Sequence, residues 1–513
     1  MGQTSRQLAF VEILRFRRSL KRSVSSGAWF QTLRRVSPQQ ALPYMSRCFG
    51  SMALRNNSCK LPIPKQIRKG ELSKGHGHLS GHDRKEHWMT ISKDGPSNCF
   101  VYITLPEKTK PVTAGRFSLK QDRQGTNVGQ FVYGRTYREN PEAVEIDPAE
   151  LQIAARTYET AAMGGIFGSL RDAGPDHWGR RLIEKCAGKA PLGELDYLLH
   201  SPDDRAGALG FGLNVDPPAP SHHFNKTIDL ARLQEIADTI VRDEEVDEAA
   251  DREQIEKILL LGTSMGGARP KAVVEDESGL WLAKFNRTDD RWNQARVEHA
   301  MLLLGRECGL VTADSRITSV AGRDVLLVKR FDREKSEDGY YRTRMVSGLT
   351  LLRAEDSHRS RGLWSYILLA EELRRVCAEP QRQAQELFKR MCFNALISNT
   401  DDHPRNHAAI AKNRSWKLSP AYDLTPSTPI SVEQRDLALI CGDQGRIARA
   451  SNFLSQCHRF LLDKEEAVKI IKDMTNIVRT TWYNIARSAG VSESDCRTIE
   501  GAFVYPGFEA EKL

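Results

Sequence analysis

The stretch Asn399-Thr400-Asp401-Asp402-His403-Pro404-Arg405-Asn406 decides the fold class, together with Asp423, seventeen residues beyond its last member. An Asp, an Asn five residues later and a second Asp downstream are the residue set of a phosphoryl-transfer site. Transfer of the γ-phosphoryl group of ATP needs positioning and charge neutralisation more than covalent help. The stretch therefore predicts a kinase, although by itself it is equally compatible with a turn rich in Asp and Asn.

Each of the three residues has a chemical role in that prediction. Asp401 is the candidate catalytic base, which orients or accepts the proton of the substrate hydroxyl. Asn406 offers an amide oxygen and Asp423 a carboxylate to Mg²⁺, a hard cation that keeps water and phosphate oxygens as its other ligands.

Residues 260–285 read as a loop, a strand, a turn and a second strand. Gly266 and Gly267 permit close approach of the backbone to phosphate groups, and Lys271 begins the first strand beside them. The second strand, over 280–285, presents Lys284 to the phosphates. Gly266, Gly267, Lys271 and Lys284 are therefore the candidate ATP-binding residues of this part of the chain.

Apolar residues with helical spacing over 293–308 predict a helix that carries Glu298, placed to reach back to Lys284. A single lysine or glutamate is usually a solvated surface charge. The order of loop, strand lysine, helix glutamate, Asp-x4-Asn and Asp is what carries the kinase prediction.

With these residues in this order, the chain resembles the HipA-like serine/threonine kinases, whose founding members are toxins of bacterial toxin–antitoxin modules. The resemblance runs over most of residues 96 to about 480. Its specific parts are Asp172-Ala173-Gly174-Pro175-Asp176-His177-Trp178-Gly179-Arg180 and the loop Gly266-Gly267-Ala268-Arg269-Pro270-Lys271.

The resemblance implies ATP and Mg²⁺ as cofactors, with Asp401 as base, Asn406 and Asp423 as metal ligands and Lys284 on the phosphates. It also implies that Lys329 and Phe331 flank the adenine through backbone groups. Ser264 falls where the family autophosphorylates a loop serine, and the added charge of roughly −1.5 to −2 would exclude that loop from the ATP pocket. The loop lacks the G-x-G-x-x-G spacing of ordinary protein kinases.

Partners follow from the resemblance alone. It implies a protein substrate, with aminoacyl-tRNA synthetases as the precedent, and a small DNA-binding antitoxin through which any contact with nucleic acid would be indirect. A cytoplasmic location is expected from the cysteine pattern described below, not from the resemblance. Two alternatives stay open: a small-molecule kinase of the aminoglycoside phosphotransferase kind, and a catalytically silent regulatory or binding protein.

Composition fits a globular enzyme, with 513 residues of which 40% are hydrophobic and 27% charged. No apolar run approaches eighteen residues, so no membrane span is predicted. The net charge of +9 comes from residues 1–90, which hold 17 basic and four acidic residues and leave 58 basic against 62 acidic in the rest. Ten scattered cysteines without a C-x-x-C pair predict reduced, packed thiols.

The first ninety residues admit several explanations. Residues 1–55 are rich in Arg and Ser, which is compatible with a start codon assigned too early (Met52 or Met89 being the true start), a disordered basic arm or an organellar presequence. The first two are favoured. The histidines of 76–87 are separated by glycines, which favours a flexible linker over a metal site.

The predicted architecture is α+β: a two-lobed protein-kinase-like fold with a β-rich N-lobe, an α-helical C-lobe and a small N-terminal β/α subdomain. We expect a basic tail over 1–90, the N-terminal subdomain over 91–215, the N-lobe with its phosphate loop over 216–331 and the C-lobe over 332–513.

Overall fold

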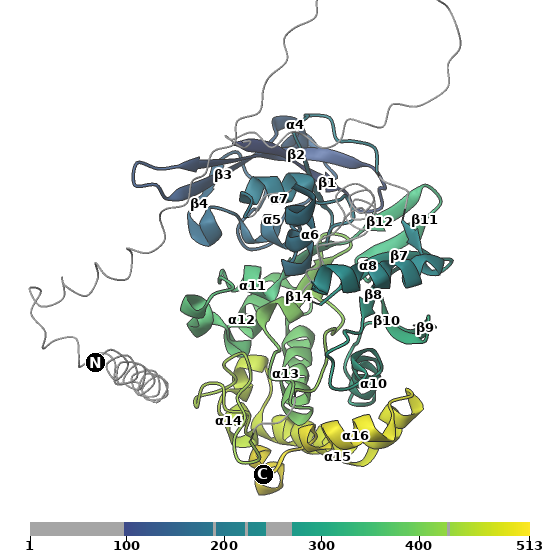
Figure 1. The fold of residues 1–513 in the computed structure, drawn as a ribbon. Coiled ribbons are helices and arrows are strands. Elements are labelled where there is room, and N and C mark those ends of the chain that lie inside the picture. The colour runs from purple at the N-terminus through teal and green to yellow at the C-terminus, as the bar shows by residue number, and fades with distance from the viewer. Residues whose placement is uncertain (1–96, 188–190, 221–223, 243–268, 428–430) are drawn as a thin grey trace, which may run out of the picture. The chain divides into compact units, whose positions relative to one another are not determined.

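The computed structural model describes residues 97–187, 191–220, 224–242, 269–427 and 431–513. Figure 1 follows these segments from purple at residue 97 to yellow at the C-terminus. A sheet-rich first half gives way to a mainly helical second half, as the sequence predicts. Within the described segments, no helix is both long enough and apolar enough to cross a membrane.

A five-stranded antiparallel sheet opens the described chain, with the strand order β4-β3-β2-β1-β5. The sequence predicts β1, β2 and β3, because β-branched and aromatic residues alternate there with polar ones. The expected strand over 205–211 instead begins four residues later, after Gly207 has turned the chain with a φ of 76°. The strands are β1 (Asn98–Thr104), β2 (Pro111–Gln121), β3 (Asn127–Tyr133), β4 (Thr157–Thr160) and β5 (Leu209–Gly212).

Four short helices accompany this sheet: α4 (Arg135–Glu139), α5 (Gly168–Asp172), α6 (His177–Ala187) and α7 (Glu194–His200). Asp176 caps α6 as the sequence predicts, because its carboxylate accepts from the backbone N–H of Gly179 at 2.8 Å. Trp178 of α6 is buried in one cluster with side chains of the second sheet, so this helix shares its core with the strands that carry Lys284.

The second sheet has the order β6-β7-β8-β10-β9. Its strands are β6 (Asn225–Lys226), β7 (Lys271–Asp276), β8 (Gly279–Phe285), β9 (Ser315–Val320) and β10 (Arg323–Lys329), accompanied by α8 (Leu230–Arg242) and α10 (Gln294–Glu307). The β9–β10 turn contains Ala321 and Gly322, both with positive φ, which is the backbone of a tight hairpin. The sequence predicts this hairpin and the β7–β8 pair.

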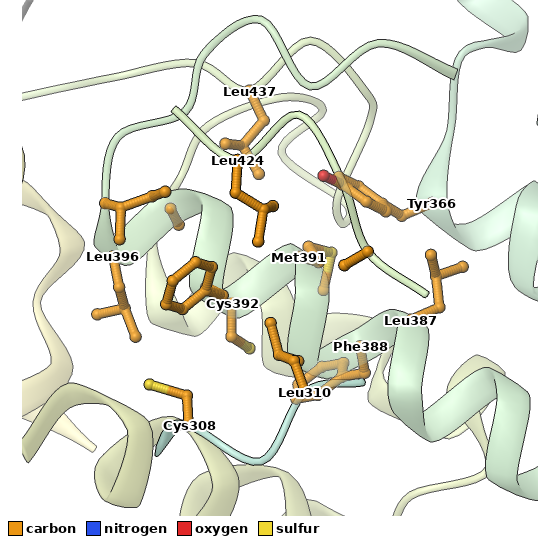
Figure 2. Packing of buried hydrophobic residues seen from close by; sticks show 14 of the residues in the cluster. Cys308, Leu310, Tyr366, Leu387, Phe388, Met391, Cys392, Leu396, Leu424 and Leu437 are labelled. Atoms are coloured by element: carbon orange, nitrogen blue, oxygen red, sulfur yellow. The ribbon is translucent and has the colours of Figure 1, made fainter. Parts of the chain in front are cut away.

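The second half of the chain is built on helices around a large apolar core. They are α11 (Gly348–Leu351), α12 (Tyr366–Val376), α13 (Pro380–Leu396), α14 (Ala450–Ser455), α15 (Lys464–Ser488) and α16 (Glu493–Ile499). Figure 2 shows part of this core, in which Leu387, Met391 and Cys392 of α13 lie among side chains from several other segments. The three longest helices, α12, α13 and α15, are the ones that the sequence predicts, because their apolar positions recur every three to four residues.

This half also contains five short strands that the sequence analysis does not predict. They are β11 (Arg333–Ser336), β12 (Gly339–Arg342), β13 (Arg344–Ser347), β14 (Ala408–Ala411) and β15 (Lys417–Leu418). The seven cysteines whose side chains the structure describes are buried and free, which agrees with the predicted packed thiols. The domain boundaries near residues 90, 215 and 331 stay predictions.

Candidate active site

Lys284 stands at the centre of the site, on the central strand β8. Its ammonium lies 2.6 Å from a carboxylate oxygen of Glu298 and 2.5 Å from one of Asp423. Glu298 is held by α10, whose start is capped by the side chain of Asn293 at 3.1 Å from the N–H of Arg296. The structure thus brings together three predicted residues that are separated by up to 139 positions in the chain.

The three charged groups of this cluster alter one another's pKa values. Burial alone would lower the pKa of Lys284, but the carboxylates of Asp423 and Glu298 raise it above its usual value. Burial alone would raise the pKa of Asp423, yet the ammonium of Lys284 holds it below its usual value. Glu298 has its pKa raised, first by burial and then by the charge of Asp423, although Lys284 opposes both. An ionised Lys284 and Asp423 are the forms that an ATP and metal site requires.

Asp423 lies in a short loop that is fixed on both sides. Its φ of 59° places it in the left-handed region, which Asp tolerates better than most residues and which often marks functional sites. The next residue, Leu424, is buried in the apolar core of Figure 2. The hydroxyl of Tyr422 donates to the backbone oxygen of Arg405 at 2.8 Å, which ties this loop to the stretch 399–406.

Asp401 lies in the same region and has an altered acidity. Partial burial raises its pKa, with further increases from the charges of Asp423 and other carboxylates, while His403 lowers it. The backbone oxygen of Asp401 accepts from the side-chain amide of Asn406 at 3.3 Å. Asn406 is buried at the end of a 3-10 turn, Pro404–Asn406 (η5). The three residues predicted from the stretch 399–406 and Asp423 therefore share one corner of the molecule.

A buried polar network supports this corner, and the sequence analysis missed it. Asp402 accepts from the hydroxyl of Tyr366 on α12, and its carboxylate lies 2.8 Å from Nε2 of His407. Asn399 donates from its side chain to Asn394 of α13 at 3.0 Å. Asp402 stands inside the stretch 399–406 and His407 directly follows it, but Tyr366 is 36 residues from Asp402 and no local signal links the two.

A pocket opens beside Lys284 and Asp423. Lys329 and Phe331, predicted to flank adenine, both line it, and Leu282, Val328 and Met345 give it an apolar wall. Asp172 and Arg405 also line the pocket and were not predicted as site residues.

Not every predicted site residue lines this pocket, and three of them cannot be placed. Lys271 is buried and pairs with Asp176 at 2.6 Å, and it is absent from the pocket lining. This ion pair joins the Asp-x-Trp string to the strand after the glycine loop. Gly266, Gly267 and Ser264 lie outside the described residues.

The donor set fits Mg²⁺ better than a metal that needs a full protein cage. Asn406 and Asp423 supply one amide and one carboxylate oxygen, the combination that Mg²⁺ accepts when phosphate and water complete its shell. Burial is the main cause of the raised pKa of Asp401, and the charge of Asp423 adds to it; a cation beside Asp423 would offset that repulsion. In the described part of the chain no three His, Cys, Asp or Glu side chains cluster as a metal site, and the histidines of 76–87 lie outside it.

The fold and the site define a protein-kinase-like α+β protein. HipA of Shewanella oneidensis MR-1, solved in a complex with HipB and operator DNA, matches the structure with a TM-score of 0.58 at 15% identity, over 81% of this chain and 97% of that one. Residues 263–482 match the HipA-like C-terminal domain. These matches confirm the resemblance to the HipA-like kinases, with residues 263–482 as the part similar to the HipA-like C-terminal domain, and they confirm the predicted fold class.

Two curated relatives carry the name "Putative kinase". The one from Haemophilus influenzae is 24% identical over 226 residues, which is 39% of this chain and 65% of the relative. The one from Sinorhizobium fredii is 26% identical over 210 residues, which is 40% of this chain and 48% of the relative. The chain thus spans about half to two-thirds of the length of these relatives.

Proposed function

We propose that the protein is an ATP- and Mg²⁺-dependent kinase that phosphorylates serine or threonine hydroxyls of a protein. The observation that carries the proposal is the contact of Lys284 with both Glu298 and Asp423 at the edge of a pocket lined by Lys329 and Phe331. This is the lysine–glutamate pair and metal aspartate of a phosphoryl-transfer site.

The residues divide the work as follows. Lys284 neutralises phosphate charge on ATP, and Glu298 fixes its position. Asn406 and Asp423 would hold Mg²⁺, which supplies charge neutralisation at the phosphates when it is bound. Asp401 orients the acceptor hydroxyl and takes its proton as the new O–P bond forms. Lys329 and Phe331 offer backbone groups to the adenine.

Regulation and partners are proposed from the family alone. Ser264 is the proposed site of autophosphorylation, which would remove the loop from the ATP pocket. A toxin role, with a DNA-binding antitoxin, follows from the resemblance, and the solved HipA is itself in a complex with HipB and operator DNA. An aminoacyl-tRNA synthetase remains the proposed class of substrate.

The test is incubation of the purified chain with γ-labelled ATP and Mg²⁺, followed by mass-spectrometric mapping of phosphosites. The matched variant is Asp401→Asn, which keeps the shape of the side chain and removes the charge that orients the nucleophile. We expect label on Ser264 in the wild type, none in Asp401→Asn, and loss of the main site in Ser264→Ala.

Other results would redirect the assignment. An active Asp401→Asn would contradict the role of Asp401, and unchanged labelling of Ser264→Ala would move the autophosphorylation site elsewhere. ATP binding without protein label would favour a small-molecule acceptor. Failure to bind ATP would leave a silent protein on a kinase scaffold.

A further inference from the structure

The proposed mechanism leaves two arginines unused: Arg405, which lines the pocket, and Arg171, which is next in the chain to the pocket residue Asp172. Arg171 is the penultimate residue of α5, and Arg405 belongs to η5. Both elements pack against β13 and α11. The approach is close, since a Cβ on Gly168 would lie 2.5 Å from Oγ1 of Thr350, and one on Gly348 would lie 2.7 Å from the backbone oxygen of Pro404.

Nearby acidic groups are already engaged. Asp172 accepts from the N–H of Ser347 at 2.7 Å, from its hydroxyl at 2.8 Å and from the hydroxyl of Thr350 at 2.7 Å. Both oxygens of Glu194 accept from Arg180, at 2.8 and 2.7 Å. Asp356, half-exposed, lies 3.2 Å from Nε of Arg405.

Arg171 differs from its neighbours. Among the described residues its guanidinium has no hydrogen-bond or ion-pair partner, although the side chain is partly buried. Its pKa is lowered, first by burial and then by the positive charges of Arg405 and Arg180, while Glu194 and Asp356 act in the opposite direction. A partly buried cation without an acceptor is costly unless a ligand supplies one.

We propose that Arg171 and Arg405 form an anion-binding subsite that receives an acidic side chain of the phosphoryl acceptor. The planar guanidinium fork suits carboxylate and phosphate groups alike. Arg405 lines the same pocket as Lys284 and Asp423, so an anion bound to it would lie near the proposed site of phosphoryl transfer. The proposal that an anion binds here does not depend on the proposed function. The proposal that this anion belongs to the phosphoryl acceptor does rest on the proposed kinase function.

The first experiment measures anion binding by calorimetry, with the full chain and inorganic phosphate as the probe. It is run with and without saturating AMP-PNP and Mg²⁺. We expect phosphate to bind in both conditions, and Arg171→Gln to weaken it about tenfold or more, the size of one charge-assisted hydrogen bond. Arg171→Lys should retain part of the affinity, because it keeps the charge without the fork.

The matched control is Arg479→Gln. This change removes one exposed arginine, which pairs with Glu511 and is distant in sequence from Arg171 and Arg405. It should leave phosphate binding unchanged. Equal phosphate binding by the wild type and Arg171→Gln would overturn the subsite. Phosphate binding that AMP-PNP abolishes would also overturn it, because the arginines would then serve the phosphates of ATP.

The second experiment identifies the source of the anion. Serine peptides flanked by glutamates, by glutamines or by phosphoserines are titrated against the AMP-PNP-bound chain. We expect the glutamate peptide to bind about tenfold more tightly than the glutamine peptide, and Arg171→Gln and Arg405→Gln to remove the difference. A preference for the phosphoserine peptide alone would assign the subsite to a previously phosphorylated acceptor and overturn the acidic side chain.

Failure of the two proposals can be told apart. If the chain does not bind AMP-PNP, the kinase function falls, and phosphate binding lost in Arg171→Gln would still show the anion subsite. If it binds AMP-PNP but does not distinguish the peptides, the acceptor subsite falls and the kinase function stands.

Discussion

At the scale of single residues, Lys284 contacts two carboxylates that have different proposed roles. It neutralises the buried carboxylate of Glu298 and also fixes Asp423, a proposed metal ligand. Loss of this one ammonium would therefore disturb ATP binding and the metal site together.

We expect Lys284→Met to lower kcat/KM about 100- to 1000-fold, the size of the effect of removing one charge-stabilising donor. Glu298→Gln should cost less, because the contact of Lys284 with Asp423 remains. Initial rates with γ-labelled ATP measure both effects, and thermal unfolding shows whether the variants fold. A Lys284→Met enzyme within about threefold of the wild type would refute the role of this lysine.

Asp401 makes a prediction about pH. Its pKa is raised, first by burial, so it takes up a proton at a higher pH than an ordinary aspartate, and the protonated form cannot act as a base. We expect kcat/KM to fall as the pH drops through this raised pKa. Because His403 lowers the pKa of Asp401, His403→Gln should move the acidic limb of the profile to higher pH. A shift to lower pH would contradict this electrostatic account.

At the scale of elements, the helix that carries Glu298 depends on an anchor at its start. Asp324, at the beginning of β10, accepts from Arg296 at 2.5 Å and from the side chain of Asn293 at 2.6 Å. These bonds hold the first turn of α10 to the β9–β10 hairpin. Asp324 thus anchors the first turn of α10, the helix that places Glu298 beside Lys284.

Asp324 should therefore contribute stability that depends on pH. Its pKa is lowered to about 2, mainly by the hydrogen bond from Arg296, whereas an aspartate in the unfolded chain titrates near about 3.9. The contribution is full above the unfolded pKa and is lost as the pH falls towards the folded one. In urea unfolding between about pH 5 and 2, Asp324→Asn should lose less stability than the wild type. Parallel curves for the two proteins would refute the anchor.

The same scale shows what the sequence can and cannot predict. Helix α10 was predicted over 293–308 from its apolar spacing, and the structure has it over Gln294–Glu307 with Asn293 as its cap. The pair of Lys284 and Glu298 was predicted because kinase chemistry requires it. By contrast, β13 pairs with β14 across more than sixty residues, and short strands of this kind carry no periodic signal.

The errors and omissions in the predicted site residues have the same cause. Lys271 was assigned to the phosphates because it begins the strand after the glycine loop, yet the fold pairs it with Asp176, 95 residues earlier. Tyr366, on α12, donates a hydrogen bond to Asp402 in the loop after α13. Asp172 begins the string quoted for the family resemblance and Arg171 precedes it, and neither was predicted as a site residue. Contacts between distant segments decided each case, and local residue patterns do not encode them.

At the scale of the whole molecule, a buried ionic network joins the first sheet to the strand end that lines the pocket. Arg330 follows β10 and pairs with Asp204 and with Asp332, while Arg333 also pairs with Asp332. The side chains of Arg330 and Asp332 are 0% exposed. Asp332 also accepts from the N–H of Gly207 at 2.9 Å, just before β5.

Breaking this network should unfold the protein more readily. Arg330→Met leaves Asp204 and Asp332 without a shared cation, and removal of one partner from a buried pair costs about 3–5 kcal/mol. Urea unfolding measures the loss, with Arg479→Met as the exposed control, for which we expect less than about 1 kcal/mol. A loss for Arg330→Met no larger than that of the control would show that the network does not stabilise the fold.

The network also bears on how the chain can be dissected in the laboratory. A fragment cut to residues 263–482, where the family similarity lies, would lack Asp204 and the backbone oxygens of Arg205 and Gly207 that Arg330 and Arg333 bind. It would also lack Trp178 and Leu182, which complete the core of the Lys284 sheet. Such a fragment would expose charges and apolar surface that the intact chain conceals, so biochemical work should retain the first sheet.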